Sequence, residues 1–321
     1  MHPGVPHQLQ QRAKCLGKAR QFFADKGVLE VETPVLNQYP VTDPQVDCLR
    51  SSTAQNRPLW LRPSSEYSMK RLLAAGSGDI YEIGKVFRAG ESGSRHSNEF
   101  TMIEWYRAGF TMQDMIDETV ELLRAVTGEA AHPVQSVEQL TYVDAFQNHA
   151  ALNPLTATAE ELEKRSKSLL GSLISDHLID TFEGNRELFL DLLMSHYIEE
   201  QFAADTLTVI THYPANQAVL ARLDPDNAAV AERFEIYYRG IELANGFREL
   251  TDAAEQRQRF EHDQELRREQ EKPVPKIDED FLAALEKGLP ECSGVAVGLD
   301  RLLMAAEGYD TISATVGLPQ Q

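Results

Sequence analysis

The sequence has few features of secreted, membrane or metal-stabilised proteins. Its 3 cysteines, Cys15, Cys48 and Cys292, are odd in number and widely spaced, without a Cys-x-x-Cys motif or a Cys/His pair. This pattern suggests neither a disulfide framework nor a zinc site, and it fits a reducing cytoplasm. The N-terminal segment lacks the apolar region of a signal peptide, and no later stretch approaches the length of a membrane span. We therefore expect a cytoplasmic protein that does not associate with a membrane.

Basic residues are also scarce. The chain of 321 residues has 31 Lys and Arg against 50 Asp and Glu, which gives a formal net charge of -19. A surface of this sign repels polyphosphates, so extensive nucleic-acid binding is disfavoured, while a local basic pocket for one nucleotide stays compatible with it. With 42% hydrophobic residues the chain can bury a sizeable core. We expect a single domain over residues 1–321.

The order of the expected elements favours an α+β fold, with a mainly antiparallel sheet flanked by helices. Helical spacing of apolar residues predicts helices over residues 9–26, 66–75, 111–126, 159–170, 187–202, 249–271 and 281–286, and one that begins near residue 299. β-rich or alternating patterns predict strands over residues 28–35, 59–62, 80–88, 99–107, 206–211, 233–238, 241–245 and 294–297. Strands in hairpins, with helices in blocks between them, argue against a parallel βαβ dinucleotide fold.

One predicted hairpin, over residues 86–106, brings cations and an aromatic ring together. Arg88, Arg95 and His96 flank its loop, and the period of the returning strand places Phe100 and Glu104 on one face. A ring able to cover a base then lies beside a carboxylate able to bind an ammonium group, which suits ATP and a cationic substrate. On spacing alone, an ordinary amphipathic hairpin with surface arginines is the alternative.

Near the C-terminus, the segment from Gly294 to Gly298 predicts a strand that leads into a helix with Arg301 in its first turn. A cation at a helix N-terminus is mildly unfavourable for the helix dipole, so a bound anion or a stacked base would help to explain it. The alternative is a solvent-exposed arginine, because isolated surface charges are common.

Between these two segments, Glu235, Glu242 and Glu249 recur at intervals of seven. Gly240, Gly246 and neighbouring β-branched residues predict a hairpin here rather than a helix. Carboxylates on such a hairpin could hold Mg²⁺ through oxygen and face an ammonium group. A solvated acidic edge is the alternative.

Taken in order, these segments resemble motifs two and three of class II aminoacyl-tRNA synthetases, with the acidic hairpin of the lysine branch between them. Residues 61–72 and 241–252 are similar to lysyl-tRNA synthetase signatures, and the helix and strand that end at Pro34 resemble motif one, the dimerisation element. The resemblance implies a class II synthetase-like catalytic domain that forms a homodimer. Because motif one begins so early, we expect no N-terminal OB anticodon-binding domain. This architecture resembles a synthetase paralogue family that attaches (R)-β-lysine to a lysine of elongation factor P.

The resemblance also implies roles for individual residues. Arg88 and Arg301 would be catalytic: Arg88 would bind the α-phosphate and the substrate carboxylate, and Arg301 would sandwich the adenine with Phe100. The further ATP-binding positions are Ala89, Gly90, His96, Ser97, Glu242, Leu243 and Gly298. The substrate-binding positions are Ser64, Ser65, Glu66, Glu104, Tyr106, Asn245, Glu249 and Ala296. The implied Mg²⁺ ligands are Glu235 and Glu242.

Two of these positions depart from a usual pattern. Gly90 stands where the family usually has glutamate, so a contact near the adenine is absent or is supplied by Glu91. Ala296 stands where ordinary lysyl-tRNA synthetases have glycine and where the ligase family has alanine. Its methyl group would narrow the pocket floor and favour a substrate amine on the β carbon.

The reaction that the resemblance implies is ATP-dependent and has two steps. The carboxylate of (R)-β-lysine or lysine displaces pyrophosphate to give an acyl-adenylate, and a lysine amine of elongation factor P then attacks the carbonyl and releases AMP. Two alternatives are a minimal lysyl-tRNA synthetase-like enzyme that acts on RNA, and a non-catalytic regulatory paralogue.

Overall fold

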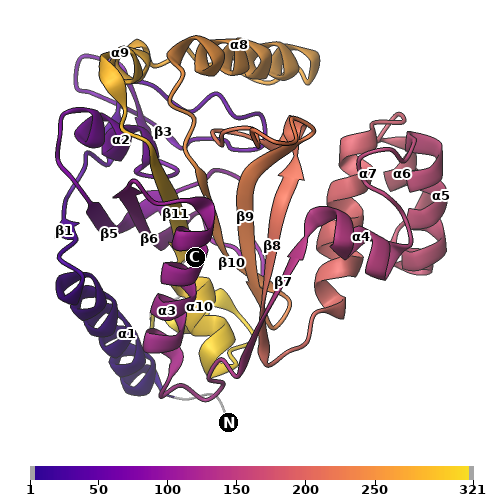
Figure 1. The fold of residues 1–321 in the computed structure, drawn as a ribbon, viewed down its shortest axis with the longest axis horizontal. Helices are drawn as coiled ribbons and strands as arrows, with labels where there is room; N and C mark the ends of the chain where they lie inside the picture. Colours follow the sequence, from indigo (N-terminus) through magenta and orange to yellow (C-terminus); the bar gives the residue numbers. More distant parts are fainter. Residues whose placement is uncertain (1–3, 318–321) are drawn as a thin grey trace.

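The computed structural model describes residues 4–317, which form an α+β fold around one large sheet (Figure 1). The expected fold class is confirmed. In this part of the chain, the pairs β1–β5 and β7–β8 are parallel and the other neighbours in the large sheet are antiparallel. In spatial order, the eight strands are β1 (Leu29–Glu30), β5 (Ile80–Phe87), β6 (Glu99–Ala108), β11 (Cys292–Gly298), β10 (Ile241–Arg248), β9 (Val230–Tyr238), β8 (Thr206–Pro214) and β7 (Ser136–Thr141).

One face of this sheet is covered by helices α1 (Val5–Asp25), α3 (Met112–Thr127) and α10 (Leu299–Glu307). Strand residues at alternate positions, such as Trp105 in β6 and Val295 in β11, pack with these helices into one buried cluster. The residues between them on each strand must point to the opposite face. That second face is where the candidate site lies.

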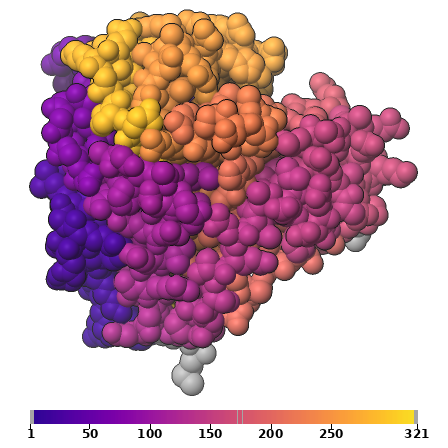
Figure 2. Space-filling view, viewed as in Figure 1, coloured from indigo at the N-terminus to yellow at the C-terminus, as the bar shows by residue number. Residues whose placement is uncertain are grey.

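Two groups of helices border the second face. Helices α8 and α9 lie across one end of the sheet in Figure 1, and a helical insert, residues 142–201, stands beside β7 and β8 and projects from the body in Figure 2. Each group has its own apolar cluster. The first group is α2 (Glu66–Ala74), α8 (Ala253–Glu269) and α9 (Glu279–Gly288), and the insert contains α4 (Tyr142–Ala150), α5 (Ala159–Leu170), α6 (Asp176–Asp180) and α7 (Arg186–Leu193).

No helix formed by the described residues is long and apolar enough to span a membrane.

A small sheet leads the chain from β1 into α2. Its strands, in spatial order, are β2 (Leu36–Asn37), β4 (Pro58–Leu61) and β3 (Arg50–Ser52). Next to β4, the buried Arg62 forms an ion pair of 2.7 Å with Glu82 of β5, and the hydroxyl of Thr33 donates to the same carboxylate at 2.7 Å. This network fixes the backbone just before residues 63–66, which enter the site.

Several predicted elements have other bounds. The strand predicted over residues 28–35 is reduced to the short β1, and β2 follows it separately. The helix predicted over residues 187–202 ends as α7, after which Met194–Ile198 forms a π-helical turn and Glu199–Gln201 a 3₁₀ turn. The helix predicted from residue 249 begins only at Ala253, because the Asp252 side chain caps it by accepting from the backbone of residues 254 and 255. Glu249 therefore lies just beyond a strand.

The segment of residues 136–150 was not predicted as regular structure. It forms β7 and α4, and α4 starts with a capping box in which Thr141 and Asp144 bond each other's backbone amides. This is a recognisable Thr-x-x-Asp start signal. β7 pairs in parallel with β8, which lies about 70 residues further along the chain, and local sequence does not reveal such a pairing.

A buried ion pair joins the first helix to the two elements that hold the expected nucleotide residues. Arg12 of α1 lies 2.5 Å from the carboxylate of Asp300 and donates to the Thr101 hydroxyl at 2.6 Å. Asp300 also accepts from the Thr101 backbone amide at 2.6 Å. Since Thr101 follows Phe100 and Asp300 precedes Arg301, Arg12 fixes the backbone at both residues.

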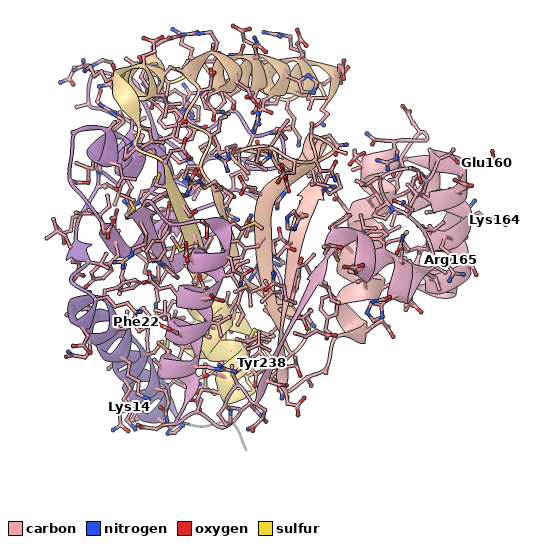
Figure 3. The ribbon with its side chains drawn as sticks, in the orientation of Figure 1. Lys14, Phe22, Glu160, Lys164, Arg165 and Tyr238 are labelled. Carbon is pink, nitrogen blue, oxygen red and sulfur yellow. The ribbon has the colours of Figure 1, made fainter. Side chains whose placement is uncertain are left out.

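We expect Arg12→Ala to lower the free energy of unfolding by about 3 kcal/mol, because it leaves the buried Asp300 carboxylate without its cation. Lys14→Ala, on the same helix but exposed (Figure 3), is the matched control and should change it by less than about 0.5 kcal/mol. Urea denaturation measures both. Equal stabilities of the two variants would contradict the role given to Arg12.

Candidate active site

The floor of the candidate site is one row of residues across four neighbouring strands. Glu104 of β6 pairs with Ala296 of β11, Ala296 with Asn245 of β10, and Asn245 with Glu235 of β9. Directly paired residues point to the same face of a sheet. On β11 the positions on this face, 294, 296 and 298, are glycine or alanine, so the centre of the floor carries almost no side chains.

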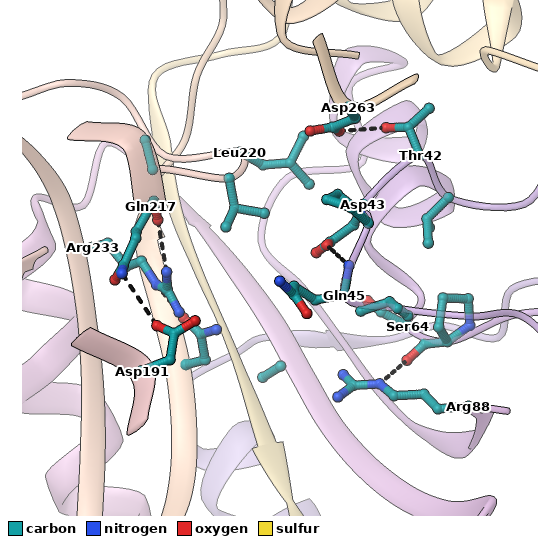
Figure 4. Close-up of a pocket in the computed structure, with 18 of the residues that line it drawn as sticks. Thr42, Asp43, Gln45, Ser64, Arg88, Asp191, Gln217, Leu220, Arg233 and Asp263 are labelled. Carbon is teal, nitrogen blue, oxygen red and sulfur yellow. Dashed lines mark hydrogen bonds between the residues drawn. The ribbon is translucent and has the colours of Figure 1, made fainter. Parts of the chain in front are cut away.

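A cavity of about 1680 Å³ lies over this floor. Figure 4 shows Ser64 and Arg88 on one side of it and Asp191, Gln217 and Arg233 on the other. The second side comes from the helical insert and from the strands next to it. The cavity therefore has room for a nucleotide together with a second substrate.

A β-bulge brings two predicted residues onto this face. The register between β10 and β9 shifts between Glu242 and Ala244. As a result, Leu243 and Ala244 both belong to the buried cluster under α1, α3 and α10, while Glu242 and Asn245 both line the cavity. Strict alternation would have pointed Glu242 and Asn245 to opposite faces.

The loop after β5 holds the first group of predicted nucleotide residues. The Arg88 guanidinium lies 5.3 Å from the centre of the Phe100 ring, its Nε donates to the carbonyl of Pro63 at 3.4 Å, and Glu91 lies 3.5 Å away. Gly90 has a φ of +79°. A glutamate would be strained at that position, and here the neighbouring Glu91 supplies a carboxylate beside Arg88.

Arg301 contacts two other predicted residues from the first turn of α10. Its guanidinium lies 3.1 Å from the carboxylate of Glu242 and 2.6 Å from the ring nitrogen Nε2 of His96. Burial lowers the pKa of His96, and the positive charge of Arg301 lowers it further. The two residues that were expected to sandwich the adenine, Phe100 and Arg301, both line the cavity.

The predicted ATP-binding residues are therefore gathered in one region. Ala89 and Gly90 lie in the turn that carries Arg88, and the Ala89 amide donates to the Asp47 carbonyl at 2.7 Å. The others line the cavity: Arg88, His96, Ser97, Phe100, Glu242, Leu243, Gly298 and Arg301.

Glu104 organises the predicted substrate end. Its buried carboxylate accepts hydrogen bonds from the Ser64 hydroxyl at 2.9 Å, the Ser65 amide at 3.0 Å, the Ser65 hydroxyl at 2.9 Å and the Tyr106 hydroxyl at 2.7 Å. Burial raises the pKa of Glu104, and these donors lower it in part. With its oxygens already occupied, Glu104 positions Ser64 and Tyr106. Of the predicted substrate residues, those that line the cavity are Ser64, Glu66, Asn245 and Ala296.

Glu249 lies deeper and next to a residue that sequence reasoning did not single out, Lys70. The Glu249 side chain is fully buried, and the Lys70 ammonium of α2 lies 2.5 Å from one of its oxygens and 2.6 Å from the Glu66 carboxylate. Burial raises the pKa of Glu249, although the charge of Lys70 acts in the opposite direction. Lys70 lies in the quoted segment 61–72, but nothing in its spacing predicts burial between two carboxylates.

The two predicted metal ligands differ in their surroundings. Glu235 is buried and held by Arg233 at 2.5 Å, by the Tyr213 hydroxyl at 2.6 Å and by the Tyr237 hydroxyl. Glu242 is partly exposed beside Arg301. Within residues 4–317, no three acidic, histidine or cysteine side chains form a preassembled metal site.

A third carboxylate, Glu199, belongs to the same region. Burial, together with the charges of Glu242 and Glu235, raises the pKa of Glu199 to about 9. It comes from the 3₁₀ turn that ends the helical insert, in a part of the sequence without a recognisable motif. Three acidic side chains are therefore gathered on this side of the cavity.

Known proteins resemble this chain over nearly its whole length. A family model described as class II tRNA synthetases (D, K and N) matches residues 1–321. The chain is 46% identical over 316 residues to the elongation factor P–(R)-β-lysine ligase of Proteus mirabilis (strain HI4320), with 97% of this chain and 94% of that protein covered. It is 44% identical over 311 residues to the protein of that name from Haemophilus influenzae (strain ATCC 51907 / DSM 11121 / KW20 / Rd), covering 95% and 93%.

The site geometry predicts that Gly294 tolerates no side chain. A Cβ atom at this position would clash with the Tyr106 ring and the Glu249 carboxylate. We expect Gly294→Ala to lower the free energy of unfolding by about 1–3 kcal/mol, as overpacking of a core does. Gly17→Ala is the matched control, since a Cβ there meets nothing within 4 Å, and a helical Gly→Ala change should raise stability by about 0.5–1 kcal/mol. A neutral Gly294→Ala, measured by urea denaturation, would refute the packing described here.

Proposed function

This chain belongs to the class II tRNA synthetase family of the D, K and N type, and within it to the elongation factor P–(R)-β-lysine ligases, and we propose that it carries out the reaction for which those relatives are named. It activates (R)-β-lysine, or lysine, with ATP and transfers it to a lysine side chain of elongation factor P. The observation that carries this proposal is the spatial order of three features along one sheet face. Arg88 lies beside an aromatic ring, the floor next to it carries almost no side chains, and buried carboxylates follow at the other end.

In the first step, the carboxylate of the amino acid attacks the α-phosphorus of ATP, an acyl-adenylate forms, and pyrophosphate leaves. Arg88 binds both reacting groups and offsets the negative charge that develops between them. Because the loop fixes its Nε on the Pro63 carbonyl and Phe100 supports the guanidinium plane, Arg88 is already oriented before substrates arrive. Phe100 and Arg301 hold the adenine ring between them.

Mg²⁺ fits the acidic side of the cavity. Mg²⁺ at nucleotide sites is usually held by one or two carboxylates together with phosphate oxygens and water, so two carboxylates on this side of the cavity would be enough. Glu242 and Glu235 would hold the ion, whose charge would relieve the repulsion that, together with burial, raises the pKa of Glu199. The ion would neutralise charge on the phosphates; Glu242 also keeps Arg301 in place.

The amino-acid end is recognised by charge. Glu66 and Ser64 lie on the cavity wall and would bind the amine near the carboxylate. Asn245, which also lines the cavity, would bind the terminal ammonium together with the buried Tyr106 and Glu249. A neutral or shorter side chain would leave a buried carboxylate without a partner, which strongly disfavours such a substrate.

In the second step, a neutral lysine amine of elongation factor P attacks the carbonyl of the acyl-adenylate, forms an amide bond and releases AMP. The nucleophile belongs to the partner protein, so this chain needs only to position and stabilise the mixed anhydride.

The protein acts as a cytoplasmic homodimer without extensive nucleic-acid binding. Exposed apolar side chains in the motif-one region, at Val5, Leu9, Leu29 and Leu36, support the dimer. The net charge of -19 disfavours RNA as the acceptor.

The first test is ATP–pyrophosphate exchange with (R)-β-lysine, (S)-β-lysine, α-lysine and arginine offered separately, followed by mass measurement of elongation factor P. We expect the fastest exchange with (R)-β-lysine, a matching mass gain on the factor, and a loss of exchange of at least 100-fold in Arg88→Ala, the order of loss for one charge-stabilising donor. Exchange led by α-lysine without a protein adduct would instead favour an RNA acceptor. No exchange with any of them would favour a regulatory paralogue.

The second test concerns Ala296, which lies between Glu104 and Asn245 on the floor. We expect Ala296→Gly to improve kcat/KM for α-lysine relative to (R)-β-lysine by roughly 10-fold, the order of discrimination that one methyl group provides. The stability should change little. An unchanged ratio in competition kinetics would mean that the methyl group does not select the amine position.

A further inference from the structure

Lys70 is a buried cation that contacts Glu66 of the cavity wall but does not itself line the cavity. Its side chain is about 1% exposed, and its ammonium lies between Glu66 at 2.6 Å and Glu249 at 2.5 Å. A lysine is almost never fully buried unless it is paired. Lys70 is also one of the largest fully buried side chains of the described protein, so its placement requires a compensating interaction.

The carboxylates of Glu66 and Glu249 provide this compensating interaction. Burial lowers the pKa of the Lys70 ammonium, while the charges of Glu249 and Glu66 raise it by more, so that Lys70 stays positively charged. The dependence is mutual, because Glu249 is fully buried and Lys70 is the cation that contacts it. The other ionisable groups that face Glu249 are Glu66 from α2, Glu104 and Tyr106 from β6, and Cys292 from β11.

Glu249 has capacity for a second cation. The Lys70 ammonium lies 2.5 Å from its Oε2, while its Oε1 accepts no hydrogen bond from the described residues. Oε1 faces Gly294 and the Tyr106 ring. A buried carboxylate in this state can still accept an ammonium group from a ligand.

The charges of the pocket can be counted. Glu66, Glu104 and Glu249 carry three negative charges when ionised, and Lys70 carries one positive charge, which leaves two. A diamino acid such as β-lysine carries two ammonium groups, and its carboxylate is taken by Arg88 under the proposed function. Without Lys70 the substrate would leave one buried negative charge uncompensated, and that is costly in a dry pocket.

We propose that Lys70 is a positioning residue that sets the charge of the amino-acid pocket: it keeps Glu66 and Glu249 apart and available, so that the pocket matches a substrate with two ammonium groups. This inference rests on the proposed function, because that function supplies the substrate. Lys70 does not touch the reacting atoms. It acts through the two carboxylates that bind the amines.

The test is Lys70→Met, which keeps the length of the side chain and removes its charge. In ATP–pyrophosphate exchange at pH 7 we expect KM for (R)-β-lysine to rise at least 10-fold, with KM for ATP changed less than 2-fold. Lys164→Met, on the exposed surface of the insert (Figure 3), is the matched control and should behave as the unmodified enzyme.

The pH profile separates this role from a merely structural one. Burial raises the pKa of Glu249, and Lys70 lowers it. Without Lys70 the carboxylate therefore stays protonated to higher pH, where it cannot accept an ammonium group. We expect the midpoint of the rise of 1/KM with pH to move up by at least one pH unit in Lys70→Met. An unchanged profile together with an unchanged KM would overturn the inference.

A charge-restoring double variant tests directly whether Lys70 and Glu66 act together. Glu66→Gln combined with Lys70→Met leaves two carboxylates, which again equal the two ammonium groups. The rise in KM of this double variant should be at least 5-fold smaller than the product of the two single effects. If the effects simply multiply, Lys70 and Glu66 are not coupled and the inference fails.

If neither of these variants folds, the inference can be tested by NMR on the unmodified enzyme. With ¹⁵N-labelled lysine, and Lys70→Arg for assignment, the Lys70 Nζ signal should keep the shift of an ammonium group up to pH 9 and move when (R)-β-lysine binds. A signal that does not respond to the substrate overturns the proposal. If the unmodified enzyme shows no exchange with (R)-β-lysine, the proposed function fails. If it is active but the Lys70 signal does not change on substrate binding, only this inference is refuted.

Discussion

The structure depends on one constraint: a carboxylate buried on a sheet face must be paired, because an unpaired buried charge is costly. This chain buries several acidic side chains on or beside a single sheet, and each is held by donors from a different element. The pairing therefore joins elements that are distant in sequence, and the same contacts that stabilise the fold set the shape of the site. The pairs are Glu82 with Arg62, Glu104 with Ser64 and Ser65, Glu235 with Tyr213, Glu249 with Lys70, and Asp300 with Arg12.

Much of this arrangement could be predicted from the sequence, because hydrophobic periodicity and motif order are local signals. Alternation along residues 99–107 gives the face of Glu104 correctly, and the Gly-Val-Ala-Val-Gly segment gives both the strand and the position of Arg301. The α+β class also followed from the order of the elements. The predicted nucleotide residues do come together in one region.

The rest depends on long-range pairing, which local patterns do not encode. The burial of Lys70 was missed, because a lysine on a helix is usually solvated and its partner Glu249, just beyond the end of β10, is distant in sequence. The parallel pairing of β7 with β8 was missed for a similar reason. Glu199 lies in a π and 3₁₀ continuation of α7, which looks like ordinary helix in the sequence.

The bulge at residue 243 has a consequence for how this site can change. Glu242 and Glu249 are seven residues apart, and on a regular strand an odd separation would place them on opposite faces. One extra residue restores the phase, so that both serve the site while Arg248 turns to the far face and contacts Phe110. A deletion of one codon after the bulge, among residues 245–247, would put Arg248 on this face and Glu249 on the opposite one, whereas a deletion at the bulge itself would leave both glutamates where they are. The face on which Glu249 lies thus depends on the number of residues in a strand as well as on their identity.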